Sequence, residues 1–278
     1  MATISKEDVL NLREKTGAGL IDCKRALSES NGDVEDAVSI LRKKGVASAA
    51  KKAGRDAGEG IIAECISEDC TQGILVEVNC ETDFVAKNED FLSFSKLVAT
   101  ELLSNPSADL EEKRTEQVGK IGENIRISRS EILSPQGNGI VESYVHTGSK
   151  VAVLISLVSE GSDSLRNNQK VLQMAKDFCM HIAATSPVCV SRDDIPSELV
   201  EKEKDIAMAQ AVGKPPQAIE KIITGKLEKY YSSACFLEQP FVKNPDQSIK
   251  DLLHTVSVEV GEVIKVDRFI RFQVGEEV

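Results

Sequence analysis

Cysteine and histidine are the residue types in this chain that could supply a nucleophile and a base. The seven cysteines are Cys23, Cys65, Cys70, Cys80, Cys179, Cys189 and Cys235. Cys179 and His181 lie two positions apart on a predicted helix, and side chains at that spacing point in different directions. This spacing argues against a Cys–His dyad. A thiol-dependent enzyme that uses Cys179 or Cys80 is kept as an alternative interpretation, and it predicts a reactive thiol with a low pKa.

Metal-binding and phosphate-binding motifs are missing from the sequence. The cysteines include no C-x-x-C pair, and no histidine stands at zinc-finger spacing, so we expect reduced thiols and no metal site. The chain has no P-loop and no G-x-G-x-x-G motif, and Gly148–Lys150 is typical of a hairpin turn. Lys51, Lys52 and Arg55 are interpreted as a solvated basic linker. We therefore expect no bound cofactor.

The segment Asn79–Phe91 places an aromatic residue among charged ones. It follows a strongly apolar strand and precedes a helix capped by Asn88, so Thr82–Lys87 is predicted to be a connection at the end of a sheet. Phe84 either folds back into the core or projects beside a carboxylate as a wedge aimed at a partner. The residues alone leave both interpretations open.

The charge balance disfavours nucleic acid and membrane surfaces as direct ligands. The 278 residues include 34 Lys and Arg against 45 Asp and Glu, a formal net charge of −11, which repels phosphate backbones and anionic lipid. Met1–Asp8 lacks the pattern of a secretory signal. The longest apolar stretch, Val151–Val158, is too short to span a bilayer. We therefore expect a cytoplasmic protein.

Residues 1–45 are predicted to form three short helices. Ser5 and Asp33 are suited to cap the first and third of them, and the third is expected to stop before Gly45. Residues 46–59, rich in Ala, Lys and Gly, are expected to form the basic linker. A unit this small is only marginally stable alone, so it should dock on something else.

From residue 60 onward the sequence predicts an α+β fold made of two related subdomains, residues 60–136 and 137–278. Each has two strands, then helices, then a closing strand, which is typical of an antiparallel sheet covered by helices. Leu75–Val78 occupies the same place in the first copy as Leu154–Leu157 in the second. The predicted strands are 61–66, 74–80, 124–133, 140–146, 151–158 and 263–274, with a long helix at 165–185.

A helical insertion interrupts the second subdomain between about residues 190 and 236. One helix starts at Ser197, Gly213–Pro216 forms a turn, and apolar residues from Ile219 to Tyr230 line one face of a second helix. This pattern predicts a helical hairpin that projects from the sheet as an arm.

Several long motifs resemble those of the bacterial elongation factor Ts family, and together they cover essentially the whole chain. The run Leu12–Leu27 is similar to the family's opening, and Gly54–Phe91 is similar to its next signature. The remaining matches are Ile121–Ile125, Tyr144–Gly148, His181–Ala184, Gln239–Val242 and Phe269–Glu276. Because these motifs occur in the family's order, the chain is identified as a member.

The resemblance implies a guanine nucleotide exchange factor for the GTPase elongation factor Tu, with no catalytic residues of its own. Thr82, Asp83, Phe84 and Val85 match the motif that dislodges Mg²⁺ from the GTPase, with Phe84 wedged between two of its helices. The matching residues at or near the same interface are Ile121, Gly122 and His146.

The resemblance also implies further contacts. The three N-terminal helices are similar to a ubiquitin-associated (UBA) fold that docks on the GTPase domain, and the second α+β subdomain contacts a distal domain of the partner. The hairpin is a possible site of self-association. Longer family members continue past the position of Val278 into a helical tail, so contacts of that tail are not expected here.

A UBA-type protein-interaction adaptor without exchange activity is the alternative hypothesis. Its three N-terminal helices would bind a different protein, so it predicts that residues 1–45 suffice for partner binding. The exchange-factor hypothesis instead predicts that Phe84 is required.

Overall fold

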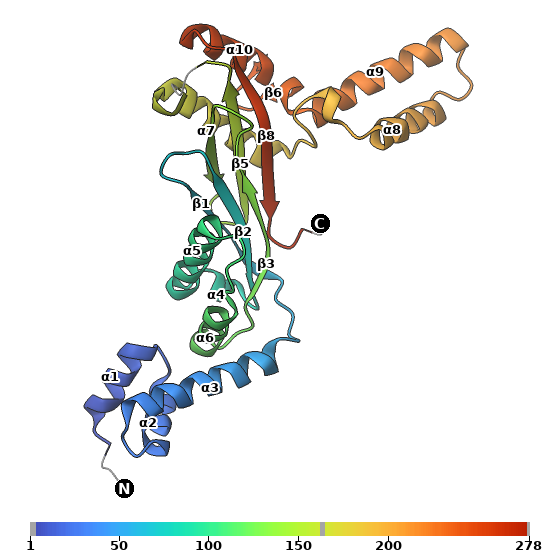
Figure 1. Cartoon of the computed structure of the whole chain (residues 1–278). Coiled ribbons are helices and arrows are strands. Elements are labelled where there is room, and N and C mark those ends of the chain that lie inside the picture. The colour runs from blue at the N-terminus through green and yellow to red at the C-terminus, as the bar shows by residue number, and fades with distance from the viewer. Residues whose placement is uncertain (1–3, 162–164, 277–278) are drawn as a thin grey trace.

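The computed structural model describes residues 4–161 and 165–276, which form an elongated molecule with three parts in a row (Figure 1). Helices from the N-terminus lie at one end, two antiparallel sheets form the middle, and a helical arm projects near the other end. Among the described residues, no helix has both the length and the apolar character needed to cross a bilayer.

The first three helices are α1 Lys6–Thr16, α2 Leu20–Glu29 and α3 Val34–Lys52. Ser5 caps α1 in a reciprocal arrangement with Asp8, and Asp33 caps α3 by accepting a backbone N–H at 2.9 Å. The three helices enclose a small core that contains Leu12 and Leu27. The predicted three-helix unit is therefore present.

Helix α3 continues through Gly45, so the expectation that it stops there is wrong. Gly45 lies where α3 crosses α6 (Glu111–Ile121), and a Cβ at Gly119 of α6 would come within 3.2 Å of the Gly45 Cα. Glycine allows the two helices to approach closely here, and it does not end one of them. Residues 46–52 of the expected linker are therefore helical. Within them, Ala49 is buried in the core of the first sheet.

The first half of the α+β region contains a sheet with the strand order β1-β2-β3. Its elements are β1 Glu59–Ile66, β2 Gly73–Cys80, α4 Asp83–Ala86, α5 Glu89–Ser104, α6 and β3 Arg126–Leu133. Strand β2 is buried along its whole length because both of its faces are covered. Val76 packs in the core with Phe91 of α5, whereas Leu75 faces the second sheet.

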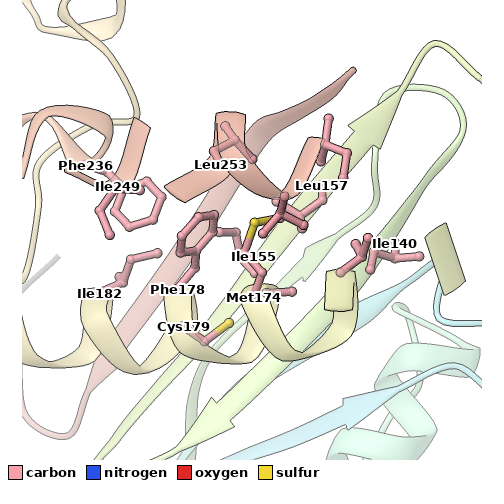
Figure 2. Packing of buried hydrophobic residues seen from close by; sticks show 14 of the residues in the cluster. Ile140, Ile155, Leu157, Met174, Phe178, Cys179, Ile182, Phe236, Ile249 and Leu253 are labelled. Carbon is pink, nitrogen blue, oxygen red and sulfur yellow. The ribbon is translucent and has the colours of Figure 1, made fainter. Parts of the chain in front are cut away.

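The second half contains a sheet with the strand order β4-β5-β8. Its elements are β4 Gly139–Val145, β5 Val151–Ser159, η1 Leu165–Asn167, α7 Gln169–Thr185, η3 Phe236–Glu238, β6 Pro240–Phe241, β7 Asn244–Ser248, α10 Ile249–Val260 and β8 Ile264–Gln273. The predicted long helix begins four residues late, at Gln169, because Asn168 is its cap. Figure 2 shows the core of the second half, where the ring of Phe178 packs edge-on against the ring of Phe236 with centroids 5.3 Å apart.

The two halves repeat one another, as the sequence predicts. Both sheets place their second strand in the centre, and both central strands shift register at matching positions, after Glu77 in β2 and after Ser156 in β5. The sheets also pack face to face through a shared core of Ile62, Leu75, Leu133, Val141, Ala152, Leu154, Ile270 and Phe272. Each sheet is therefore covered by helices on one face and by the other sheet on the second face.

The predicted arm is a helical hairpin of α8 Ser197–Gln210 and α9 Pro216–Ala234, preceded by η2 Arg192–Asp194 (Figure 1). The guanidinium of Arg192 anchors its base. It donates to Glu228 Oε1 at 2.8 Å, pairs with Glu238, and lies 4.4 Å from the centre of the Tyr231 ring. These contacts hold the arm against the second half.

Candidate protein-contact site

A one-turn helix at the end of β2 carries Thr82, Asp83, Phe84 and Val85. Strand β2 ends at Cys80, and Thr82 caps α4 because its Oγ1 accepts the Val85 N–H at 3.3 Å. Val85 is half-buried against the core of the first sheet, whereas the Phe84 side chain is 81% exposed. The structure therefore decides between the two interpretations of Phe84, which projects into solvent.

The carboxylate of Glu123 holds this turn in place. Its Oε2 accepts the backbone N–H groups of Glu81 and Thr82 at 3.0 Å each, and its Oε1 accepts the Thr82 hydroxyl at 2.7 Å. In return, Glu81 Oε1 accepts the Asn124 N–H at 2.6 Å. Hydrogen bonds to a carboxylate are stronger than those between neutral groups. These reciprocal bonds therefore fix the turn relative to the loop Ile121–Ile125.

Ile121 and Gly122 begin the loop that delivers Glu123. Ile121 ends α6 and is partly buried against the core of the first sheet. Gly122 has φ 91°, a left-handed conformation, and its N–H donates to the Val118 carbonyl at 3.0 Å. The structure thus brings Ile121 and Gly122 together with the Thr82 turn through Glu123.

His146 comes from the second half, in the hairpin that joins β4 to β5. It is exposed, and its Nδ1 lies 3.0 Å from the hydroxyl of Tyr144. Lys150 in the same hairpin pairs with Glu59 at the start of β1, and Glu59 lies opposite Cys80 in the sheet register. The hairpin with His146 and the turn with Phe84 therefore lie at the same end of the packed sheets.

Asp83 and Lys87 form an ion pair beside Phe84. Lys87 Nζ donates to Asp83 Oδ2 at 2.9 Å, and this hydrogen bond lowers the pKa of Asp83 and raises the pKa of Lys87. Both side chains are exposed, so solvent and salt screen the pair. The pair adds little stability, but it leaves Asp83 ionised next to the exposed ring at neutral pH.

The buried thiols of Cys80 and Cys179 lack the properties of catalytic nucleophiles. Burial raises the pKa of Cys80 to about 12 and raises the pKa of Cys179 well above its ordinary value, so both stay protonated at neutral pH. The Cys179 thiol donates to the Glu142 carbonyl at 3.4 Å, while His181 bonds to Gln239 at 2.8 Å. Cys179 and His181 thus have different partners, as their spacing predicts.

A groove beside β3 is lined by two arginines whose guanidinium groups already donate hydrogen bonds to backbone carbonyls. Arg114 donates to the Ile125 carbonyl at 2.8 Å, and Arg126 donates to the Arg55 carbonyl at 3.0 Å. Within residues 4–161 and 165–276, no group of three or more Cys, His, Asp or Glu is arranged to hold a metal ion.

Sequence reasoning did not identify Glu81 or Glu123. A signal for Glu123 was present, because a Gly-Glu pair occurs at the same point of both copies, as Gly122-Glu123 and Gly261-Glu262. No signal marked Glu81, since the pairing of its carboxylate with a backbone amide of the other loop depends on the folded chain.

An exposed aromatic ring on a firmly held turn is typical of proteins that act by binding other proteins. The comparison with known sequences gives the family. A sequence model described as "Elongation factor TS" matches residues 81–276.

The chain is also similar over nearly its full length to proteins named "Elongation factor Ts". The relative from Clostridium perfringens (strain SM101 / Type A) is 44% identical over 290 residues, which cover 98% of this chain and 93% of the relative. The relative from Prosthecochloris aestuarii (strain DSM 271 / SK 413) is 41% identical over 99% of this chain and 100% of the relative. The chain therefore belongs to the elongation factor Ts family and is a translation elongation factor.

Proposed function

We propose that this chain is a guanine nucleotide exchange factor for elongation factor Tu and binds that GTPase in its GDP-bound or nucleotide-free form. The observation that carries the proposal is the Phe84 side chain, 81% exposed on a turn that Glu123 fixes through three hydrogen bonds. A large apolar ring held in one direction in water offers a partner apolar surface that is already ordered for binding.

Exchange acts on the partner's Mg²⁺ and phosphate site. A GTPase holds GDP largely through backbone amides of its phosphate loop and through Mg²⁺, which requires nearly ideal octahedral geometry. A ring that wedges between two packed helices shifts them between discrete arrangements, since packed elements do not deform smoothly. Displacement of Mg²⁺ by this route releases GDP.

The proposal assigns roles to the residues gathered at this end of the molecule. Phe84 is the wedge, and Thr82, Asp83 and Val85 complete the turn that presents it. The further contacts with the partner, in the loop and the hairpin that lie at the same end, are assigned to Ile121, Gly122 and His146. The chain acts by binding and catalyses no covalent step.

Thermodynamic linkage follows from this mechanism. If the chain weakens the GTPase's affinity for GDP by some ratio, GDP must weaken the affinity for the chain by the same ratio. Incoming nucleotide therefore displaces the chain, which is then free to act again in the cytoplasm.

Release of fluorescent GDP from elongation factor Tu of the same organism, followed by stopped flow, tests the function. We expect a large, saturable acceleration that Phe84→Ala reduces by about 30-fold or more, the scale of an interface hot spot. Val258→Ala is the matched control, because Val258 is another apolar side chain, 68% exposed, in the second half. An equal loss in both variants would contradict the role of Phe84.

Absence of any acceleration by the wild-type chain would favour the adaptor hypothesis. The N-terminal helices would then be the binding element, through the exposed side chains of Leu20 and Ile21 at the start of α2. Ile21→Asp in the full chain would abolish partner capture, while Phe84→Ala would leave capture unchanged.

We also propose that the arm contributes to self-association. Ile206, Met208 and Val212 are apolar and exposed on α8 and just after it. Sedimentation analysis of the wild-type chain and of Val212→Asp tests this proposal. A concentration-dependent dimer that the variant lacks is expected, and identical monomeric behaviour of both would contradict it.

A further inference from the structure

A Gly-Glu pair follows a helix at the same point of both halves, and its carboxylate bonds at the end of the central strand or in the turn after it. In the first half, Gly122 ends α6 in the left-handed conformation and Glu123 bonds to the Thr82 turn. In the second half, Gly261 ends α10 with φ 77°, and Glu262 Oε2 accepts the Ser159 hydroxyl at 2.8 Å. The Gly-Glu pair is therefore a repeated feature of the fold.

The two Gly-Glu pairs differ in what lies beside them. Glu262 bonds to Ser159, the last residue of β5, and Ser159 is only 8% exposed. The turn held by Glu123 carries Phe84, which is 81% exposed. The bonds of Glu123 therefore fix the direction of a side chain that a partner can reach.

We propose that Glu123 is a positioning residue for nucleotide exchange, which holds the Thr82 turn so that Phe84 projects in one fixed direction. The proposal rests on the proposed exchange function and adds a residue to it. Glu123 need not touch the partner. It acts by removing alternative conformations of the turn, so that less conformational freedom is lost when the ring enters its binding site.

The carboxylate is matched to this task by its number of acceptors. It meets three donors, the N–H groups of Glu81 and Thr82 and the Thr82 hydroxyl. A glutamine at the same place is neutral and has one acceptor oxygen, and its amide nitrogen would have to donate to the Thr82 hydroxyl where the carboxylate accepts from it. Glu123→Gln therefore keeps the size of the side chain but loses the charge that strengthens the clasp of the Thr82 turn.

Stopped-flow GDP release with a double-mutant cycle tests the proposal. We expect Glu123→Gln to lower the maximal acceleration about tenfold in the wild-type chain and to have no further effect in Phe84→Ala. Glu262→Gln is the matched control and should leave exchange unchanged. A loss of equal size with and without Phe84, or no loss in the wild-type background, would overturn the proposal.

Amide hydrogen exchange gives a second readout that needs no partner. In Glu123→Gln the amides of Glu81 and Thr82 should exchange about tenfold faster, while those of α5 stay unchanged. Unchanged protection of the two amides would overturn the proposal. If the wild-type chain itself fails to accelerate GDP release, the exchange function is what fails, and the amide data still decide whether Glu123 holds the turn.

Discussion

The two halves of the molecule share a scaffold, and the first half adds an exposed aromatic ring after its central strand. Three residues before the helix cap, Val85 in the first half and Leu165 in the second half both pack against the core, and in the first half Phe84 points into solvent beside Val85. Both turns end at an asparagine that caps the following helix, Asn88 before α5 and Asn168 before α7. The turn of the first half thus supplies a core residue, as the second half does with Leu165, and presents an exposed ring as well.

The comparison shows why a binding residue can change without loss of the fold. The caps, the register shift and the Gly-Glu pair all recur, and they depend on residues other than the one at the tip of the turn. Exposure of Phe84 therefore costs the first half little stability and offers a partner a large apolar surface.

Leu165→Ala should give the largest change in stability. Leu165 is buried in the main core of the second half, so truncation should lower the free energy of unfolding by about 2–5 kcal/mol. Phe84→Ala should lower it by less than about 0.5 kcal/mol. Urea denaturation of both variants measures the difference, and GDP release should show the opposite order. A Phe84→Ala protein that unfolds as easily as Leu165→Ala would break the comparison.

Substitution of valine for each of the two left-handed glycines should distinguish an effect on stability from an effect on GDP release. Gly122 and Gly261 both have positive φ with no atom within 4 Å of an added Cβ, so the cost is that of the backbone conformation alone. Gly122→Val and Gly261→Val should each lower the free energy of unfolding by about 1–2 kcal/mol. Only Gly122→Val should also slow GDP release, because it displaces Glu123, which holds the turn that carries Phe84. Equal rates for the two variants would show that this clasp has no part in exchange.

The second half should be more sensitive to acid than the first. Its buried His181 is held neutral, with Nδ1 accepting the Val242 N–H and Nε2 bonded to Gln239, and burial lowers the pKa of His181 below 6.5. The unfolded chain then binds more protons than the folded one below pH 6.5. Stability should therefore be complete above that pH and fall as the pH drops towards the folded-state pKa.

Urea denaturation of the wild-type chain and of His181→Gln at pH 7 and pH 5.5 checks this. The wild-type loss attributable to His181 should be at most about 1.4 kcal/mol per pH unit and should be absent in the variant. His146→Gln, at an exposed histidine of the same half, is the control and should behave as the wild type. A variant that retains the full pH dependence would assign the effect to other groups.

The smallest effect is expected at the exposed ion pairs beside the two turns. Asp83 pairs with Lys87 at 2.9 Å and Glu160 pairs with Lys265 at 2.8 Å, and in each case the lysine lowers the pKa of the carboxyl group. A depressed pKa means that the contribution is present above the ordinary carboxyl pKa and is lost only as the pH falls through the folded-state value. Neither pair should therefore cause a change in stability between pH 6 and pH 8.

Asp83→Asn and Glu160→Gln are the corresponding variants. Both should unfold at nearly the wild-type urea concentration, and Asp83→Asn should change the rate of GDP release by no more than about twofold, because solvent screens the pair. A much larger loss in Asp83→Asn alone would show that this carboxylate contacts the partner directly.

Much of the local structure was predictable, because it depends on neighbours in the chain. The caps at Ser5 and Asp33, the strands of both sheets and the arm all follow from short-range patterns, and each is present. The role of Gly45 was not predictable in this way, since a glycine can end a helix or allow a close crossing. The presence of Gly119 on α6 decides between these uses, and nothing near Gly45 in the sequence indicates it.

The sequence by itself determined the family, the α+β class, the internal repeat and the position of the turn with Phe84. The tertiary structure alone decided that the ring of Phe84 points outward, that Glu123 holds its turn across a separation of 41 residues, and that the two sheets pack on one another. The physical reason is the range of the interactions. Periodicity and capping act within a few residues, whereas burial and a carboxylate's choice of donors depend on which distant surfaces meet when the chain folds.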